Sequence, residues 1–265
     1  MKIAIVADST ICPTKEQQET YRFEIVPVNV RFEGKVYRDW IDLTPNQAYG
    51  FLDKNPKDWA TSAPSPGDFL NAFKKIKESG ITEILCLTVP KGLSATWNSA
   101  RLAKEHAKTE LPDVKIELVD PQTLGAGETL LVINAHHLMQ EEKSLEEIAL
   151  FIENLKSKIK LYFLLETIKH IHRSGRVPEI ASKIGSLLPL KPILKISDGK
   201  FRPAAACTNK EKGLEKLLEL LKAEVDQNYL DIGIMHADCL KDAQALKEKA
   251  LSAFPSAKIF ISEVS

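Results

Sequence analysis

Short apolar runs alternate with amphipathic stretches along the first 158 residues. Nearly continuous apolar runs indicate buried strands at Lys2 to Ala7, Glu24 to Phe32, Ile84 to Val89 and Ile116 to Val119. Apolar residues at helical spacing indicate helices at Thr44 to Leu52, Ser65 to Lys77, Ser94 to His106 and Ser144 to Lys158. A further helix is expected after Gly127 and through Met139. Strands and helices in this alternating order predict a mostly parallel sheet with helices on both faces.

The pattern changes beyond Lys158, where we predict a domain boundary. Strands are expected at Lys160 to Leu165, Asp231 to Ala237 and Lys258 to Ser262, a hairpin with an Asp198-Gly199 turn at Lys191 to Phe201, and helices at Lys210 to Val225 and Lys241 to Phe254. The sequence therefore predicts an α/β protein of two domains. These are an N-terminal, mostly parallel, Rossmann-like three-layer sandwich (1–158) and a smaller C-terminal α/β domain (159–265).

The composition narrows the classes of function. Of the 265 residues, 44% are apolar, and 36 basic residues balance 36 acidic ones. A chain without net charge gives no reason to expect the concentrated positive face that binds nucleic acid or an anionic membrane. No apolar run approaches the length of a bilayer span, and Met1 leads straight into a strand rather than a secretory signal. We expect a cytoplasmic protein with no nucleic-acid partner and no stable membrane insertion.

The spacing of cysteine and histidine predicts no metal site. The four cysteines, which form no CxxC pair, are Cys12, Cys86, Cys207 and Cys239. His170 and His172 are two positions apart and would point in different directions on a helix, while His236 is distant from both. We expect reduced structural thiols, surface or hydrogen-bonded histidines, and neither a metal nor another cofactor.

Two clusters of hydroxyl residues form the candidate functional site. The segment Thr61 to Ser65 precedes a predicted helix, and the segment Ser94 to Thr96 follows a buried strand. With Asp8 and Asp120, these residues are expected near the carboxyl ends of strands, where ligands collect in open α/β sheets. Hydroxyls can donate hydrogen bonds to a carboxylate without adding positive charge, and neither cluster contains an obvious catalytic group. The pattern favours holding a carboxylate over breaking a bond.

Catalytic alternatives have weaker signals. Ser94 with Asp120 and a histidine could make a hydrolase or transferase, but a nucleophile elbow needs a glycine two residues before and after the serine. Gly92 satisfies the first position, and Thr96 occupies the second. Gly125-Ala126-Gly127 lacks the spacing of a dinucleotide fingerprint, and the chain contains no P-loop motif.

Five segments, taken in order, resemble the motifs of one family. They are Asp8-Ser9-Thr10 (its DST), Thr61 to Ser65 (TSxPS), Leu93 to Ala100 (LSGTYxSA), Arg173 to Val177 (KGGRI), and Lys191 to Leu194 with Asp198-Gly199 (KPIL…DG). Together they extend over nearly the whole chain. On these motifs the chain resembles the DegV family of bacterial fatty-acid-binding proteins.

The resemblance implies a ligand and a site. A DegV-type protein is expected to enclose one long-chain fatty acid, such as palmitate, between two domains and not to be an enzyme itself. It would present the carboxylate to a separate ATP-binding subunit of a fatty acid kinase, which phosphorylates it. Carried onto this sequence, the carboxylate-binding residues are Thr61 and Ser94. Ser62 and Thr96 are further candidates that could instead cap the helices that follow them.

The basic segment around Arg173 bears on a protein partner, and the differences from the family motifs bear on that partner and on how the carboxylate is bound. Arg173 and Arg176 are candidates for docking the kinase subunit, and a solvated face is the alternative explanation. An arginine that the family pattern has after the DG turn is missing around Cys207, which leaves that docking open. Ala95 replaces the glycine of LSGT, and the sequence ends at Ser265, ahead of an expected HxGPG-like segment. We therefore expect binding rather than turnover.

Overall fold

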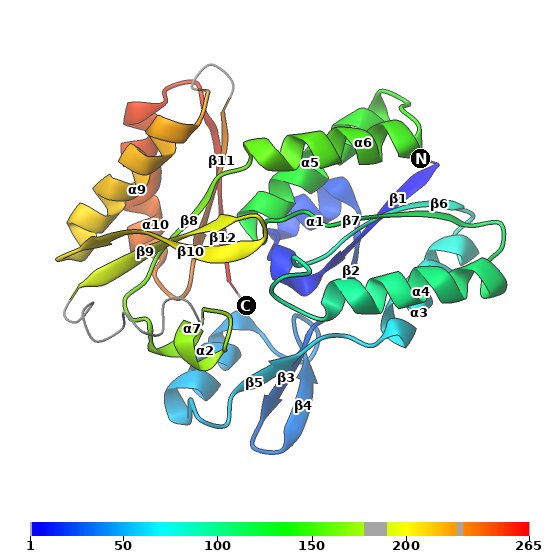
Figure 1. Cartoon of the computed structure of the whole chain (residues 1–265), viewed down its shortest axis with the longest axis horizontal. Helices are drawn as coiled ribbons and strands as arrows, with labels where there is room; N and C mark the ends of the chain where they lie inside the picture. The colour runs from blue at the N-terminus through cyan, green and yellow to red at the C-terminus, as the bar shows by residue number, and fades with distance from the viewer. Residues whose placement is uncertain (1, 178–189, 227–229, 265) are drawn as a thin grey trace.

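The computed structural model describes residues 2–177, 190–226 and 230–264 and has the predicted α/β class (Figure 1). Its N-terminal part contains a parallel four-stranded sheet in the order β2-β1-β6-β7. These strands are Glu24–Val26, Ile3–Asp8, Glu83–Leu87 and Lys115–Val119. The prediction of a mostly parallel N-terminal sheet is confirmed.

Helices cover both faces of this sheet, because its strands alternate apolar side chains to both sides. α3 (Pro66–Glu78) and α4 (Thr96–Glu110) pack on the face that carries Ile84 and Cys86. α5 (Ala126–Gln140) and α6 (Leu145–Leu155) pack on the opposite face, against Leu85 and Leu87. The result is the expected three-layer arrangement.

Local capping signals fix where several helices begin. α2 (Pro45–Lys54) starts at a capping box between Thr44 and Gln47, as its sequence indicates. Ser65 and Ser144 cap α3 and α6 in the same way. The structure adds short elements that the pattern did not predict: η1 (Ser9–Ile11), α1 (Lys15–Tyr21) and α7 (Lys169–Arg173). The predicted helix from Ser144 to Lys158 is α6 followed by the 3₁₀ turn η2 (Lys156–Lys158).

The predicted single strand from Glu24 to Phe32 is wrong. It is two strands that belong to different sheets, because Pro27 interrupts the run and cannot donate a ladder hydrogen bond. β3 (Asn29–Phe32) pairs antiparallel with β4 (Lys35–Arg38) and β5 (Ala60–Ser62) in a small sheet of order β4-β3-β5. The hydroxyl cluster that contains Thr61 therefore reaches its site from this second sheet.

The C-terminal part is built on two separate sheets. An antiparallel sheet has the order β10-β9-β8, and its strands are Lys200–Cys207, Lys191–Ser197 and Leu161–Leu164. β11 (Asp231–His236) pairs in parallel with β12 (Lys258–Glu263). α10 (Leu240–Ala253) packs on this pair, and α9 (Lys210–Glu224) packs on the antiparallel sheet and against α10. Within the described residues, β8 and β11 are edge strands that do not pair with each other.

The predicted hairpin turn is confirmed. Asp198 and Gly199, with φ angles of 52° and 68°, connect β9 to β10. Positive φ at both central residues is what a type I′ turn requires, and Asp-Gly supplies it readily. The boundary between residues 158 and 159 stays a prediction.

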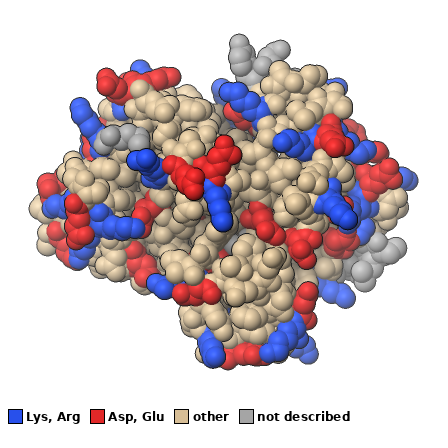
Figure 2. Space-filling model, turned by 180° about the vertical axis from the view of Figure 1, so that it is seen from behind, with Lys and Arg blue, Asp and Glu red and all other residues tan. Residues whose placement is uncertain are grey.

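The surface follows from the neutral composition. Figure 2 shows basic and acidic side chains interspersed over the face seen from behind, without a broad field of one sign. In the part of the chain that the structure describes, no helix is both long and apolar enough to cross a bilayer.

Candidate ligand cavity

A cavity of about 550 Å³ opens where the small antiparallel sheet, the carboxyl ends of β1 and β6, and strands β8 and β11 come together. We call it the main chamber. Most of its lining is apolar: Val28, Val30, Trp59, Val89, Leu93, Leu124, Leu161, Phe163, Leu164, Leu165, Phe201, Met235, Ala237 and Val264. A space of this size and lining suits a mainly hydrocarbon ligand.

Hydroxyl groups from two of the predicted clusters meet in this chamber. Thr61 and Ser62 line it from β5, and Ser94 lines it from the loop that precedes α4. Thr10, the last residue of the DST motif, also lines it from η1. The structure therefore brings Thr61 and Ser62 together with Ser94, which is distant from them in the sequence.

Thr96 lies outside this lining and contacts Ser94 instead. Thr96 is fully buried, and its Oγ1 lies 2.8 Å from Ser94 Oγ in a hydrogen bond. The backbone N–H of Thr96 also donates to Ser94 Oγ, at 3.2 Å. Both bonds hold the Ser94 hydroxyl at the start of α4, so Thr96 is suited to orient Ser94 rather than to touch a ligand.

The fully buried carboxyl group of Asp8 accepts hydrogen bonds from two residues that line the chamber. Its Oδ1 accepts hydrogen bonds from the N–H and the hydroxyl of Thr10, at 2.9 and 2.6 Å, and its Oδ2 accepts one from Val89 N–H, at 2.5 Å. Burial raises the pKa of Asp8, and these hydrogen bonds oppose that shift. Asp8 thereby ties Thr10 to the end of β6, and both neighbours line the chamber.

The two candidate docking arginines have different places. Arg176 is exposed but lines the chamber, and its Nε donates to the carbonyl of Leu93 at 3.3 Å. Arg173 does not line the chamber, and its Nη1 donates to the carbonyl of Pro56 at 2.7 Å. The segment that begins with α7 therefore fastens two loops, one of which carries Ser94. The sequence motif indicated a basic patch but not that Arg176 stands at the chamber rim.

The residues of the alternative hydrolase site are not assembled around Ser94. The carboxylate of Asp120 lies 3.7 Å from Lys91 Nζ and accepts from the N–H of Gln122, and it does not line the chamber. His170 and His172 are on the exposed helix α7. The hydroxyl of Ser94 pairs with Thr96 and not with a histidine. Among the described residues, no cluster of three His, Cys, Asp or Glu side chains could hold a metal ion.

Several chamber residues escaped the sequence analysis. Tyr162 and Met235 come from β8 and β11, whose sequences indicate strands but not which face meets a ligand. The alternation in β11 was an available signal, since Ile232 and Ile234 face the core with α10 while Gly233 and Met235 face the chamber. The chamber as a whole offers an apolar volume, uncharged hydroxyl donors and one arginine at its rim. This arrangement suits an amphipathic acid.

Comparisons with known proteins agree with this geometry. The sequence profile described as "Uncharacterised protein, DegV family COG1307" matches residues 2–265. A DegV domain-containing protein of Clostridium perfringens is 33% identical over 264 residues, which cover 98% of this chain and 90% of that protein.

Two proteins with the same fold have solved structures whose descriptions name fatty acid binding or a bound fatty acid. A DegV family protein from Thermus thermophilus, described by its fatty acid binding, is 26% identical with a TM-score of 0.90, and the match covers 100% of this chain and 93% of that one. The fatty acid kinase B3 protein of Streptococcus pneumoniae, loaded with linoleic acid, is 25% identical with a TM-score of 0.88 and the same coverage.

Proposed function

The chain belongs to the DegV family, and from this premise we propose that it binds one long-chain fatty acid in the main chamber and presents the carboxylate to an ATP-dependent kinase subunit. The observation that carries the proposal is the apolar chamber of about 550 Å³, which Thr61 and Ser62 of β5 and Ser94 of the loop before α4 line together. The fatty acids held by the similar proteins of Thermus thermophilus and Streptococcus pneumoniae support the ligand class. The chain itself is the binding subunit and not the enzyme.

The hydroxyl groups of Thr61 and Ser94 hold the carboxylate in this proposal, and Ser62 is a third donor. Hydrogen bonds from neutral hydroxyls leave the carboxylate more reactive toward a phosphoryl group than a bidentate arginine pair would. Thr96 acts through Ser94, because its hydroxyl and its N–H both contact Ser94 Oγ. The tail provides most of the affinity, since each buried methylene contributes ~0.8 kcal/mol.

The rim of the chamber is where a kinase subunit would have to approach. Arg176 lines the chamber, and Arg173 lies on the same short segment, so both are candidate contacts for a partner that carries phosphate. A protein that works with a soluble ATP-dependent enzyme is expected in the cytoplasm. The domain boundary near residue 158 belongs to the same proposal, because the chamber is lined from both sides of it.

The decisive experiment combines ligand identification with two matched substitutions. Mass spectrometry of an organic extract of the purified protein should find a long-chain fatty acid at about one per chain. Ser94→Ala and Thr61→Val should each weaken binding of palmitate roughly 10- to 100-fold, because a hydrogen bond to a charged group is worth about 1.5–3 kcal/mol. Ser99→Ala is the control, since Ser99 lies in α4 and does not line the chamber.

A different result would identify another function. A protein that carries no lipid, hydrolyses a generic ester and loses that activity in Ser94→Ala would be a hydrolase, and the proposal would fail. Unchanged palmitate affinity in both variants would place the carboxylate elsewhere.

A further inference from the structure

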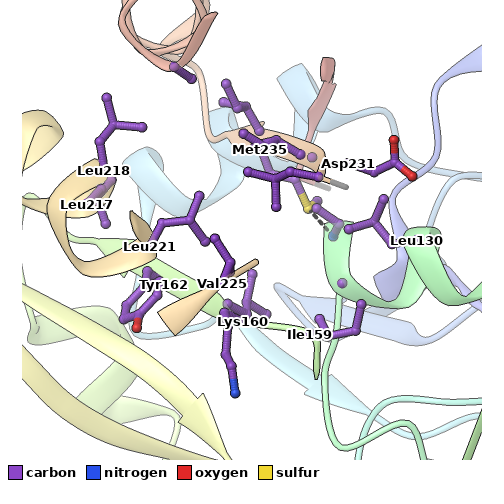
Figure 3. Close-up of a pocket in the computed structure, with 18 of the residues that line it drawn as sticks. Leu130, Ile159, Lys160, Tyr162, Leu217, Leu218, Leu221, Val225, Asp231 and Met235 are labelled. Atoms are coloured by element: carbon purple, nitrogen blue, oxygen red, sulfur yellow. Dashed lines mark hydrogen bonds between the residues drawn. The ribbon is translucent and has the colours of Figure 1, made fainter. Parts of the chain in front are cut away.

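A second apolar space adjoins the main chamber (Figure 3). Its volume is about 180 Å³, and we call it the annexe. Its lining includes leucines of α9 and α10 and two isoleucines of β11, namely Leu217, Leu218, Leu221, Leu246, Ile232 and Ile234. Five residues line both spaces, namely Ala126, Leu161, Tyr162, Gly233 and Met235.

The annexe exists because two strand edges stand apart. β8 is the last strand of one sheet and β11 the first of another, and within the described residues they do not pair. Leu161 and Tyr162 of β8 and Gly233 and Met235 of β11 border the chamber on one side and the annexe on the other. The two spaces therefore adjoin at the slot between these strands.

Met235 occupies the partition between the two spaces. Its Sδ accepts a hydrogen bond from the backbone N–H of Ala126, at 2.8 Å, drawn as a dashed line in Figure 3. The sulfur also lies so close to Gly125 that a Cβ there would approach it to 2.6 Å. Methionine is unbranched and has three rotatable bonds, so this side chain can change rotamer with only a weak N–H···S bond to lose.

The lining of the annexe is mostly apolar, with Lys158, Lys160, Tyr162 and Asp231 as its polar members. The candidate head-group residues Thr61, Ser62 and Ser94 line the chamber and not the annexe. In Figure 3 the ammonium group of Lys160 points away from Leu217, Leu218 and Leu221, and the carboxylate of Asp231 lies on the other side of the pocket, near Leu130. Lys160 Nζ donates instead to the carbonyl of Ser157, at 3.1 Å.

We infer that Met235 determines how binding depends on acyl-chain length, because the terminal methylenes of the longest ligands enter the annexe only when the Met235 side chain changes rotamer. This inference rests on the proposed fatty acid binding and names a specificity-determining residue for it. Each methylene that enters the annexe tightens binding roughly fourfold, the equivalent of ~0.8 kcal/mol. A chain that ends at Met235 gains nothing from the annexe.

A chain-length series tests the inference. Dissociation constants are measured for saturated acids from 12 to 20 carbons with the wild-type protein, Met235→Ala, and Met235→Ala combined with Leu221→Phe. Met235→Ala should extend the rise of affinity to longer acids, by roughly 15-fold for each added pair of carbons. Leu221→Phe should cancel this gain, because Leu221 lines only the annexe. Met139→Ala is the control, since Met139 packs in the core behind the parallel sheet.

The outcomes separate the inference from the function beneath it. Wild-type binding with the same length profile in Met235→Ala would overturn the inference and leave the proposed function intact. Absence of binding at every length, in every protein, would overturn both.

A second measurement needs no variant. A crystal of the wild-type protein with a 20-carbon acid that carries a terminal bromine should give an anomalous peak between Leu221 and Ile232. A peak confined to the main chamber, beside Phe163 or Val30, would overturn the inference.

Discussion

The interior beneath the parallel sheet and the interior around β8 and β11 are packed differently. Four of the five residues of β6 are buried, and Leu85 and Phe73 are fully enclosed in its two helical layers. All four residues of β8 are only half-buried, and both the main chamber and the annexe border this strand. The interior packed on the parallel sheet stabilises the fold, and the interior around β8 and β11 leaves space for a ligand. The division explains how one chain can be stable and still be hollow.

Paired leucine truncations test this contrast most strongly. Leu85→Ala should lower the free energy of unfolding by about 3–5 kcal/mol, because it opens a cavity where the surroundings are dense. Leu221→Ala should cost about 2 kcal/mol or less, because Leu221 is partly exposed and already borders empty space. Urea unfolding followed by circular dichroism gives both values. Equal losses would mean that the two interiors do not differ in packing.

Hydrogen exchange should show the same contrast in the ligand-free protein. Amides of β8 and β11 should exchange faster than those of β1 and β6, because edge strands beside empty space open locally at lower cost. A fatty acid at 100 times its dissociation constant adds about 2.7 kcal/mol, which should slow exchange in β8 and β11 about 100-fold. Acetate, which has the head group without the tail, serves as the control. Ligand-free protection of β8 equal to that of β1 would contradict the prediction.

Glu128 is one of several buried polar side chains of the described residues that lack a hydrogen-bond partner, and the one with a carboxyl group. Glu128, in the first turn of α5, is fully buried, and neither carboxyl oxygen has a hydrogen-bond partner. Burial raises its pKa well above 4.5, and the nearby Asp8 carboxyl adds to the shift. A raised pKa in the folded state means that the stability from protonated Glu128 is complete below about pH 4.5 and is lost as pH rises through the raised value.

Glu128→Gln removes that titration. Relative to the wild type, the variant should gain unfolding free energy as the pH rises from 5 to 8, because an amide does not titrate, whereas the buried Glu128 carboxyl ionises more readily in the unfolded chain. Unfolding curves across this range provide the test, and Glu147→Gln at the exposed capping box is a control with the opposite sign, because hydrogen bonds from Ser144 lower the pKa of Glu147. Parallel pH profiles for wild type and Glu128→Gln would show that Glu128 does not titrate there.

The smallest effect concerns the contact between the two regions. Gly34 and Gly199 both adopt positive φ in hairpin turns, but only at Gly199 would a Cβ meet a neighbour, Pro90 Cβ at 3.1 Å. Gly34→Ala should cost about 1–2 kcal/mol from backbone strain alone. Gly199→Ala should cost about 1 kcal/mol more, because it also pushes the β9–β10 hairpin away from the loop that leads to Ser94. Identical thermal shifts in the two variants would show that this contact is loose.

Local signals in the sequence predict much of the fold. Thr44, Ser65 and Ser144 each cap a helix where their spacing to Gln47, Asp68 and Glu147 indicates one. The Asp198-Gly199 turn and the buried strands of the parallel sheet follow from equally local rules. Thr14 and Gln17 form the same box at α1, but that seven-residue helix buries only Gln17 and so has no apolar stripe to reveal it.

What the sequence could not predict depends on contacts between distant segments. Pro27 marks a break, but only the pairing of β3 with β5 shows that Thr61 enters the chamber from a second sheet. Ser94 and Thr61 could be proposed from motifs, whereas Met235 and Tyr162 are ordinary strand residues until β8 and β11 are seen to stand apart. The space between β8 and β11 exists because these two strands do not pair with each other, and the absence of pairing produces no local pattern in the sequence.

The fastening of α7 bears on how a visiting protein could act. Arg173 and Arg176 donate hydrogen bonds to the carbonyls of Pro56 and Leu93, and Leu93 lines the chamber. A partner protein that bound both guanidinium groups would have to break their hydrogen bonds to these carbonyls. Binding of the partner and opening of the chamber would then be coupled, so the fatty acid would be released only when the receiving protein is bound.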